Sequence, residues 1–314
     1  MRQDVLPRAA DRSETPPAAA EPPRRRHRYW AAYLALLPTV ALIGLFAYEP
    51  AINGIIHSFF TWRPGFTSTF TGLANYERML TDELWWSSVA NLGYVFVFGI
   101  FTWIVPFIAA QLVISLSRRR AQFVFRTVLI LPIAFPQIVT LLIWSFMYHP
   151  QDGVLNSLLS GIGLDGLRQN WLGDPGLALL SLLVIGFPWV AGLPFLIFLT
   201  ALQNIPQEIF EAAALDGAGR IRRIFSIDIP LMASQFTLLL FLAVISTLQY
   251  GMAAFVLTGG GPDNATQFPI LRMLAAAFSG RDWGYAATLS TTLFAVTLVF
   301  GLFVLATQRR RNRV

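Results

Sequence analysis

The chain has 314 residues with a formal net charge of +6, of which 55% are hydrophobic and only 13% charged. Soluble domains carry about 25% charged residues, so this chain has too little polar surface to cover a water-soluble globule, and an integral membrane protein is predicted. It has no cysteine, which excludes disulfides and thiolate metal sites, and no lysine, which excludes a phosphate-binding GxxxxGK[ST] loop.

The N-terminal residues 1–28 are rich in Pro, Ala, Glu and Arg and contain too few apolar residues to form a core, which predicts a disordered tail. A basic stretch at 24–28 directly precedes an apolar run from Tyr29 to Tyr48, within the predicted first span at 29–50. A signal peptide has this pattern, but the run is about the ~20 residues that a bilayer requires, and no clean cleavage site follows. The pattern therefore favours a retained first transmembrane helix.

Five further apolar runs are long enough to cross a bilayer, and none alternates with period two, which favours helices over barrel strands. They lie at about 89–114, 124–148, 177–200, 231–258 and 285–307. The predicted fold is all-α with six transmembrane helices, five of them in a domain at 88–307. Residues 51–87 form a loop between the first two spans, and residues 308–314 form a C-terminal tail.

The arginines indicate the orientation. Eighteen of the 23 lie in the two tails and in the loops at 118–126 and 201–230, whereas five lie on the opposite side. The positive-inside rule then predicts that both termini are cytoplasmic and that the 51–87 loop is extracytoplasmic. This explanation of the basic charge leaves no need for a nucleic-acid partner.

The fourth predicted span contains four helix breakers, namely Gly186, Pro188, Gly192 and Pro194. Such breaks persist in lipid only where neighbouring helices or a water-filled cavity satisfy the freed backbone groups. Irregular packing is one explanation, and a helix that lines a cavity is the one that the four breaks favour.

No charged residue lies in the parts of the six spans at 30–48, 88–117, 127–149, 175–207, 229–262 and 283–308. An ion-coupled secondary transporter of small neutral solutes, the alternative function, predicts ionisable groups at mid-membrane, and an intramembrane enzyme predicts clustered His or carboxylates. The spans instead carry hydroxyl, amide and aromatic groups: Thr102, Gln111, Gln137, Trp189, Ser246, Thr247, Gln249 and Tyr250. This set suits an uncharged, hydrogen-bonding solute, although interhelical hydrogen bonds also recruit such residues.

The loop at 201–231, between the fourth and fifth spans, predicts two short helices. Pro206 is a favoured first helical residue, Glu208 and Glu211 follow in the opening turns, and Gly217 supplies a left-handed stop. The second helix places Ile221, Ile224 and Phe225 on one face. Three arginines, 220, 222 and 223, lie on the other face, and Pro230 ends the helix. The segment is either a surface that fits the groove of a partner or a connector lying on lipid headgroups.

The same loop resembles the EAA loop of binding-protein-dependent ABC importer permeases. The pattern EAA, three residues, G, nine residues, I-x-L-P is met at Glu211-Ala212-Ala213, Gly217 and Ile227-x-Ile229-Pro230, with Ile229 in place of leucine. Two further stretches, Gly72–Tyr76 and Thr258–Pro262, resemble the carbohydrate branch of that family, as does the pattern from Phe125 to Asn156. The resemblance covers residues 29–307.

The resemblance implies a type I ABC importer permease of the maltose/glycerol-phosphate-like class in the bacterial inner membrane. It implies a second homologous permease, two ABC ATPase subunits and an extracytoplasmic sugar-binding protein as partners, and alternating access as the mechanism. The chain itself is then not an enzyme and binds no cofactor, because ATP and Mg²⁺ belong to the ATPases. Disaccharides, oligosaccharides, polyols and glycerol phosphate stay open as solutes, although phosphate normally requires an arginine that no span offers.

The resemblance also implies two sets of functional residues. The loop that couples to the ATPase comprises Glu211, Ala212, Ala213, Asp216, Gly217, Ile227 and Pro230. The solute path comprises Ser246, Thr247 and Tyr250, expected on one face of the fifth span, and Trp189 and Leu193 in the fourth.

Overall fold

A computed structural model describes residues 30–190 and 192–311, so the predicted disorder of residues 1–28 lies outside the described part of the chain. The chain divides into two compact units, Met1–Pro50 and Ala51–Val314. In the first unit, α1 (Trp30–Ile43) continues into a π-helical turn, η1 (Gly44–Tyr48), and α2 (Glu49–His57) begins at its end. The helix Tyr33–His57 is long and apolar enough to cross a membrane, as the sequence predicts for the first span.

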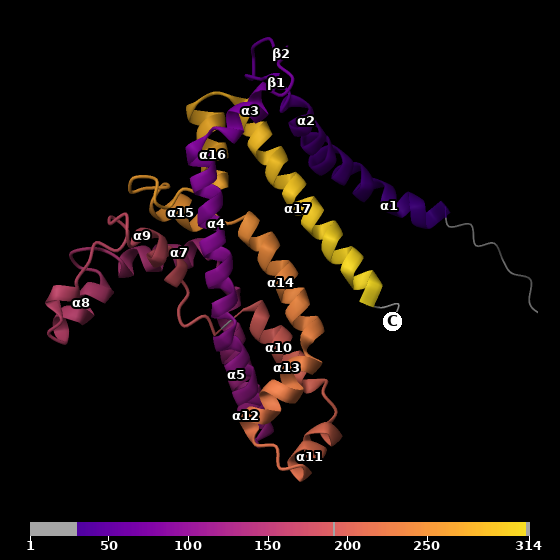
Figure 1. Cartoon of the computed structure of the whole chain (residues 1–314), viewed down its shortest axis with the longest axis vertical. Coiled ribbons are helices and arrows are strands. Elements are labelled where there is room, and N and C mark those ends of the chain that lie inside the picture. The colour runs from indigo at the N-terminus through magenta and orange to yellow at the C-terminus, as the bar shows by residue number, and fades with distance from the viewer. Residues whose placement is uncertain (1–29, 191, 312–314) are drawn as a thin grey trace, which may run out of the picture. The chain divides into compact units, whose positions relative to one another are not determined.

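The second unit begins with a small antiparallel hairpin, β1 (Phe60–Thr61) and β2 (Thr69–Phe70), with Phe60 paired to Phe70. The short helix α3 (Ala74–Leu80) leads to α4 (Glu83–Thr102), whose first turn is capped by the side chain of Asp82. Helix α5 (Ile104–Ser115) follows after one residue, and α4 and α5 together form a 33-residue apolar helix. This helix runs along the unit from the hairpin end to the opposite end (Figure 1).

The third predicted span is bent. Helix α6 (Arg119–Ile130) and the 3₁₀ turn η2 (Leu131–Ala134) meet α7 (Gln137–Met147) at 89°. Pro136 stands directly before α7, where it limits the backbone of the preceding residue and interrupts the helix. Helix α8 (Val154–Gly161) and the turn η3 (Asp165–Leu167) complete the following loop.

The fourth predicted span, 177–200, consists of two short helices, α9 (Ala178–Val184) and α10 (Leu193–Gln203). Residues between them have left-handed backbones, with φ of 85° at Gly186, 53° at Trp189 and 124° at Gly192. No helix passes through such residues. Within the described residues, four helices are long and apolar enough to cross a membrane, or five if the bent pair is one span.

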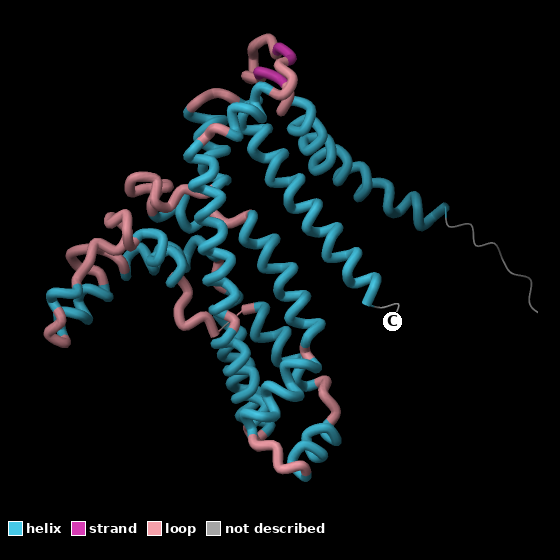
Figure 2. Tube along the Cα trace, viewed as in Figure 1, coloured by secondary structure: helices cyan, strands magenta, loops and turns pink. Residues whose placement is uncertain are grey.

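The chain then forms α11 (Gln207–Leu215), α12 (Arg220–Arg223), the π-helical turn η4 (Ile224–Asp228) and α13 (Ile229–Leu231). The apolar helices α14 (Ala233–Leu248) and α15 (Met252–Leu257) follow. Helix α16 (Pro269–Leu274), the π-helical turn η5 (Ala275–Ser279) and the long α17 (Trp283–Arg311) complete the unit, which is helical almost throughout (Figure 2).

Three buried clusters hold the helices of the second unit together. One joins α5 to α10 through Phe195, Phe198 and Leu199, which are fully buried. Another surrounds Phe268 and joins α4, α7, α9 and α15, and a third surrounds Trp85 and Tyr285 where α3, α4 and α17 meet. Large apolar side chains are exposed elsewhere, as expected for surfaces that face lipid or other subunits.

Candidate functional site

The predicted coupling loop contains a helix with a defined stop. Helix α11 begins directly after Pro206 and ends at Leu215, two residues before Gly217, whose φ is 69°. The Ala218 N–H donates to the Ala213 carbonyl at 2.9 Å, and the Gly217 N–H donates to the Ala214 carbonyl at 3.1 Å. These two bonds define a Schellman motif, so the predicted left-handed glycine stop is confirmed.

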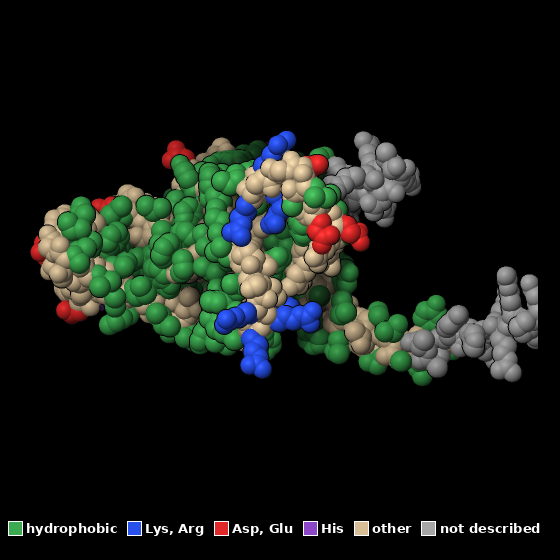
Figure 3. Space-filling view, turned by 90° about the horizontal axis from the view of Figure 1, so that it is seen from below, with side chains coloured by type: hydrophobic (Ala, Val, Ile, Leu, Met, Phe, Trp, Pro, Cys, Tyr) green, Lys and Arg blue, Asp and Glu red, His purple; other side chains and the backbone are tan. Residues whose placement is uncertain are grey.

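The exposed face of α11 carries small, apolar and acidic side chains. Glu211, Ala212 and Asp216 are exposed, whereas Ala213 is buried. Glu211 accepts a hydrogen bond of 2.9 Å from Gln207 one turn earlier, which holds the carboxylate along the helix. Leu215, at the end of the helix, is 90% exposed. In the view onto this end of the molecule, arginine and acidic side chains gather around the loop (Figure 3).

The second half of the loop differs from the prediction in two respects. Pro230 does not end the helix, because the π-helical turn η4 lets the Ile229 N–H bond to the Ile224 carbonyl, and the chain remains helical to Leu231. Arg223 does not share the solvent-exposed face of the other arginines. Its guanidinium lies 3.5 Å from the Asp228 carboxylate and 4.8 Å above the Phe210 ring. Ile227 is half-buried.

A cavity of about 280 Å³ lies among α4, α7, α9 and the breaks in the fourth and fifth predicted spans. Its polar and aromatic lining comprises Phe98, Thr102, Gln137, Thr140, Trp189 and Tyr250, and none of the residues that line it is charged. Trp189 packs edge-to-face against Phe98 with ring centroids 5.4 Å apart. The wall thus combines flat rings with hydroxyl and amide groups, which suits an uncharged hydroxylated molecule.

The structure separates the predicted solute-path residues. Trp189 and Tyr250 line the cavity together, Thr247 is buried, and Leu193 is exposed at the start of α10. Ser246 is exposed, and its hydroxyl donates to the Ala243 carbonyl of its own helix at 3.1 Å. Helix α14 ends at Leu248, so Tyr250 lies in a break and does not share a helical face with Ser246 and Thr247 as predicted.

Two further cavity residues belong to the larger group of polar residues that the sequence analysis found in the spans. Thr102 and Gln137 belong to the predicted polar group and do line the cavity, whereas Gln111 bonds to Asp228 elsewhere. Phe98 and Thr140 were missed. The spacing of Gln137 and Thr140, one helical turn apart, is a signal that could have identified Thr140.

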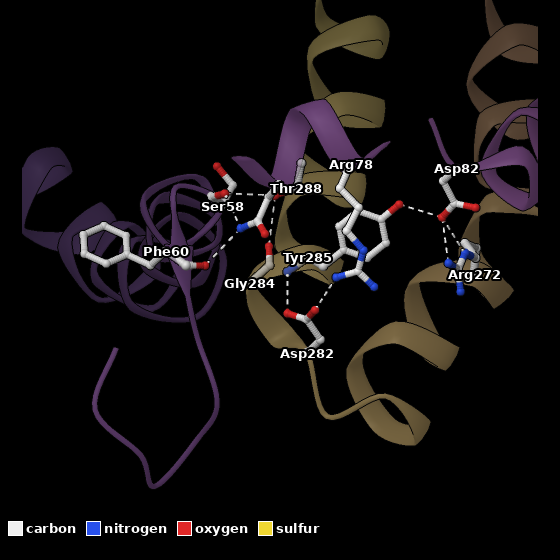
Figure 4. Close-up of polar contacts among 10 residues, drawn as sticks. Ser58, Phe60, Arg78, Asp82, Arg272, Asp282, Gly284, Tyr285 and Thr288 are labelled. Atoms are coloured by element: carbon white, nitrogen blue, oxygen red, sulfur yellow. Dashed lines mark hydrogen bonds and ion pairs between the residues drawn. The ribbon is translucent and has the colours of Figure 1, made fainter. Parts of the chain in front are cut away.

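The end of the second unit opposite the coupling loop holds a polar cluster that the sequence did not reveal (Figure 4). The Asp82 carboxylate accepts hydrogen bonds from Arg272 at 2.7 and 2.9 Å and from the Tyr285 hydroxyl at 2.6 Å. Arg78 bonds to Asp282 at 2.6 Å and lies 4.0 Å above the Tyr285 ring. The cluster joins α3, α4, α16 and α17.

Each aspartate in this cluster also caps a helix. Asp82 accepts from the Trp85 N–H at the start of α4, and Asp282 accepts from the Tyr285 N–H at the start of α17. Burial by itself raises the pKa of Asp82, but the hydrogen bonds from Tyr285, Arg272 and Trp85 outweigh it and hold that pKa below its ordinary value of 3.8.

An apolar helical bundle with an uncharged cavity and an exposed helix-turn loop at one end has the architecture of a membrane transport subunit. Residues 104–312 match the family of the binding-protein-dependent transport system inner membrane component, and the chain belongs to this family. The family resemblance expected from the EAA pattern is thereby confirmed. Among the described residues, no group of three or more His, Asp or Glu is arranged to hold a metal ion.

Individual relatives agree with this assignment. The probable ABC transporter permease protein YurN of Bacillus subtilis is 34% identical over 278 residues, covering 86% of this chain and 93% of the relative. The trehalose/maltose transport system permease protein MalF of Thermococcus litoralis is 32% identical over 286 residues, covering 89% of this chain and 94% of the relative.

The fold also matches a solved structure, a bacterial alginate ABC transporter in complex with an alginate pentasaccharide-bound periplasmic protein. The TM-score is 0.77 at 22% identity, with 90% of this chain and 95% of that chain covered. This chain thus shares its fold with a chain of that ABC transporter.

Proposed function

We propose that this chain is a permease subunit of an ATP-driven, binding-protein-dependent importer of neutral sugars and that it forms half of the translocation path. The observation that carries the proposal is the uncharged cavity, in which the rings of Phe98, Trp189 and Tyr250 stand beside hydroxyl and amide groups. Sugars present apolar ring faces and many hydroxyls, and such a wall complements both. A sugar phosphate or uronate would require a cationic partner in the cavity.

The coupling loop is the proposed contact with the ATPase. Glu211 and Ala212 on α11 and Asp216 and Gly217 directly after it are exposed, whereas Ala213 is buried. Ile227 and Pro230 lie in the helical segment that returns to α14. Because the chain has no lysine, and hence no phosphate-binding loop of the GxxxxGK[ST] type, ATP and Mg²⁺ are assigned to partner subunits.

The remaining parts of the proposal follow from this role. The complex comprises this chain, a second homologous permease, two ATPases and an extracytoplasmic binding protein in the bacterial inner membrane. Six spans then place both termini in the cytoplasm, with the coupling loop on the same side. The third span is the bent pair of helices, and the fourth is α9 and α10 together with the break between them.

Co-expression with the partner permease and the ATPase, followed by reconstitution in vesicles with the binding protein, tests the function. We expect uptake of a neutral sugar that requires ATP and the binding protein, and no uptake of sugar phosphates. Uptake that runs on a proton or sodium gradient without ATP would instead establish the ion-coupled alternative.

A further inference from the structure

Three side chains, two from the loop at 201–231 and one from α5, meet in the second unit. Asp228 is fully buried, and its Oδ2 accepts a hydrogen bond of 2.7 Å from Gln111 Nε2 on α5. The same oxygen lies 3.5 Å from Arg223 Nη2, which also lies 3.3 Å from Gln111 Oε1. Each residue of this trio therefore contacts the other two, although 117 positions separate Gln111 from Asp228.

The trio also holds α11. The Arg223 guanidinium lies over the ring of Phe210, which belongs to α11. Arg223 thus contacts both the exposed coupling helix and α5. A groove of about 880 Å³ lies between α5 and α11. Phe210, Glu211, Gln111 and Arg223 are among the residues that line it. The trio is therefore a bridge across the groove.

On the other side of the bridge, α5 is continuous with α4 as one long helix. Thr102 on α4 lines the solute cavity, and Gln111 lies nine residues later, or about 14 Å along the helix axis. Helix α5 also packs against α10 through buried phenylalanines. A displacement of α11 that is transmitted to Gln111 therefore acts on a helix that forms part of the cavity wall.

The incomplete hydrogen bonding of the trio indicates that it fixes the position of the loop against α5 more than it stabilises the fold. Arg223 Nε and Asp228 Oδ1 are buried and have no hydrogen-bond partner in the described part of the chain. A buried ion pair that is incompletely bonded stabilises a fold less than well-packed apolar residues of the same volume would. Separating Arg223 from Asp228 would leave a charge buried without a partner, which disfavours any other register of the loop against α5.

We infer that Gln111, Arg223 and Asp228 are positioning residues that fix the coupling segment to the α4–α5 helix, so that movement of α11 reaches the solute cavity. The inference rests on the proposed function. If the trio is loosened, the loop still engages the ATPase, but its motion is lost before it reaches the cavity.

The reconstituted complex tests the inference with Asp228→Asn, Gln111→Leu and the double variant. We expect the number of ATP molecules hydrolysed per sugar imported to rise severalfold in each single variant, with the affinity for the binding protein unchanged. The double variant should be no worse than the more severe single variant, because both remove the same bridge. Asp152→Asn, in an exposed turn, is the matched control that should retain the wild-type ratio. A wild-type ratio in the Asp228 and Gln111 variants would overturn the inference.

A second measurement does not depend on transport. It therefore distinguishes a failure of this inference from a failure of the proposed function. Hydrogen–deuterium exchange of the purified complex should be about tenfold faster in Asp228→Asn at residues 207–231 and unchanged near Asp82. Arg223→Lys, which keeps the charge, should restore part of the protection that Arg223→Leu loses. If exchange of the loop is the same in Asp228→Asn and wild type, the trio does not position it. Absence of ATP-driven uptake by the wild-type complex would count against the proposed function alone.

Discussion

Tyr285 donates a hydrogen bond of 2.6 Å to the Oδ2 atom of Asp82, although 203 positions separate the two residues. Arg272 donates two further hydrogen bonds to the same oxygen, and the other carboxylate oxygen caps α4. A single carboxylate therefore links the starts of two long apolar helices, α4 and α17, to α16. This cluster stands at the opposite end of the second unit from the coupling loop (Figure 1).

Replacing Asp82 should destabilise this end of the bundle. Asp82→Ala removes a helix cap, worth about 1 kcal/mol, and leaves the largely buried Arg272 without its carboxylate, so we expect a loss of about 2–4 kcal/mol in unfolding free energy. Thermal unfolding of the detergent-solubilised protein measures the change.

The matched control is Asp165→Ala. Asp165 lies 3.9 Å from Arg168, and both side chains are exposed, so this pair should contribute about 0.5 kcal/mol or less. An equal loss of stability in the two variants would contradict a special role for the Asp82 cluster.

The stability that Asp82 provides should depend on pH with a definite sign. Its pKa is lower in the folded protein than the ordinary value of 3.8, so the folded state binds the proton less readily than the unfolded state. The contribution is present above pH 3.8 and is lost as the pH falls through the folded pKa. The wild-type protein should therefore unfold at a higher temperature than Asp82→Asn at neutral pH, and the two unfolding temperatures should converge in acid. A difference that persists unchanged through that range would show that another interaction is responsible.

Sequence reasoning succeeded where structure is determined by neighbouring residues. Gly217 follows a run of helix-forming alanines, and a left-handed glycine stop depends on nothing distant. The Asp82 cluster could not be predicted, because Asp82, Arg272 and Tyr285 come together only when the helices pack. The helix breakers from Gly186 to Pro194 predicted a span that lines a cavity, and Trp189 among them does line it. Helical periodicity, in contrast, wrongly placed Tyr250 on the same face as Ser246, because α14 ends at Leu248. Arg223 resembled its exposed neighbours, since only the fold brings Gln111 and Asp228 to it.

Gly217 offers a test of the coupling loop. A Cβ at this position meets no atom within 4 Å, so only the left-handed backbone opposes a side chain there. Gly217→Asp should cost on the order of 1 kcal/mol in stability, insert normally, and abolish ATP-driven uptake through its effect at the ATPase contact. Gly217→Asn, which tolerates the left-handed conformation better, should fold nearly as wild type and still impair uptake.

Gly65 provides the control for backbone strain. Its φ is 84°, and a Cβ there also meets nothing within 4 Å, but it lies in the β1–β2 hairpin region far from α11. Gly65→Asp should match Gly217→Asp in stability while leaving ATPase coupling intact. Near wild-type uptake by Gly217→Asp in vesicles would refute the assignment of the loop.

Tyr250 and Trp189 test the solute cavity. Tyr250→Phe removes one hydroxyl but keeps the ring, which packs edge-to-face on Phe268 at 4.9 Å. Losing one neutral hydrogen bond costs about 0.5–1.5 kcal/mol, so sugar uptake should weaken about two- to tenfold and not disappear. Trp189→Ala should weaken it further by removing a stacking surface. Tyr94→Phe, on an exposed part of α4, is the control. The same concentration dependence of uptake in Tyr250→Phe, Trp189→Ala and Tyr94→Phe would exclude this cavity from the path.

The last prediction is that this chain transports nothing alone. The face of α11 that carries Leu215 has no partner within the described residues, where this side chain is 90% exposed. The cavity has no charged lining residue that could bind a proton or sodium ion and couple its gradient to sugar movement. An alternating-access path also needs a second half-bundle opposite this one.

Vesicles that contain only this subunit should therefore show neither sugar accumulation nor ATP hydrolysis, and both should appear when the second permease, the ATPases and the binding protein are added. A homodimer of this chain is the alternative to a pair of different permeases, and uptake without the second permease but with the ATPases and binding protein would identify it. Accumulation by the subunit alone under a proton or sodium gradient would overturn the ABC importer mechanism, because the energy would then enter through this chain.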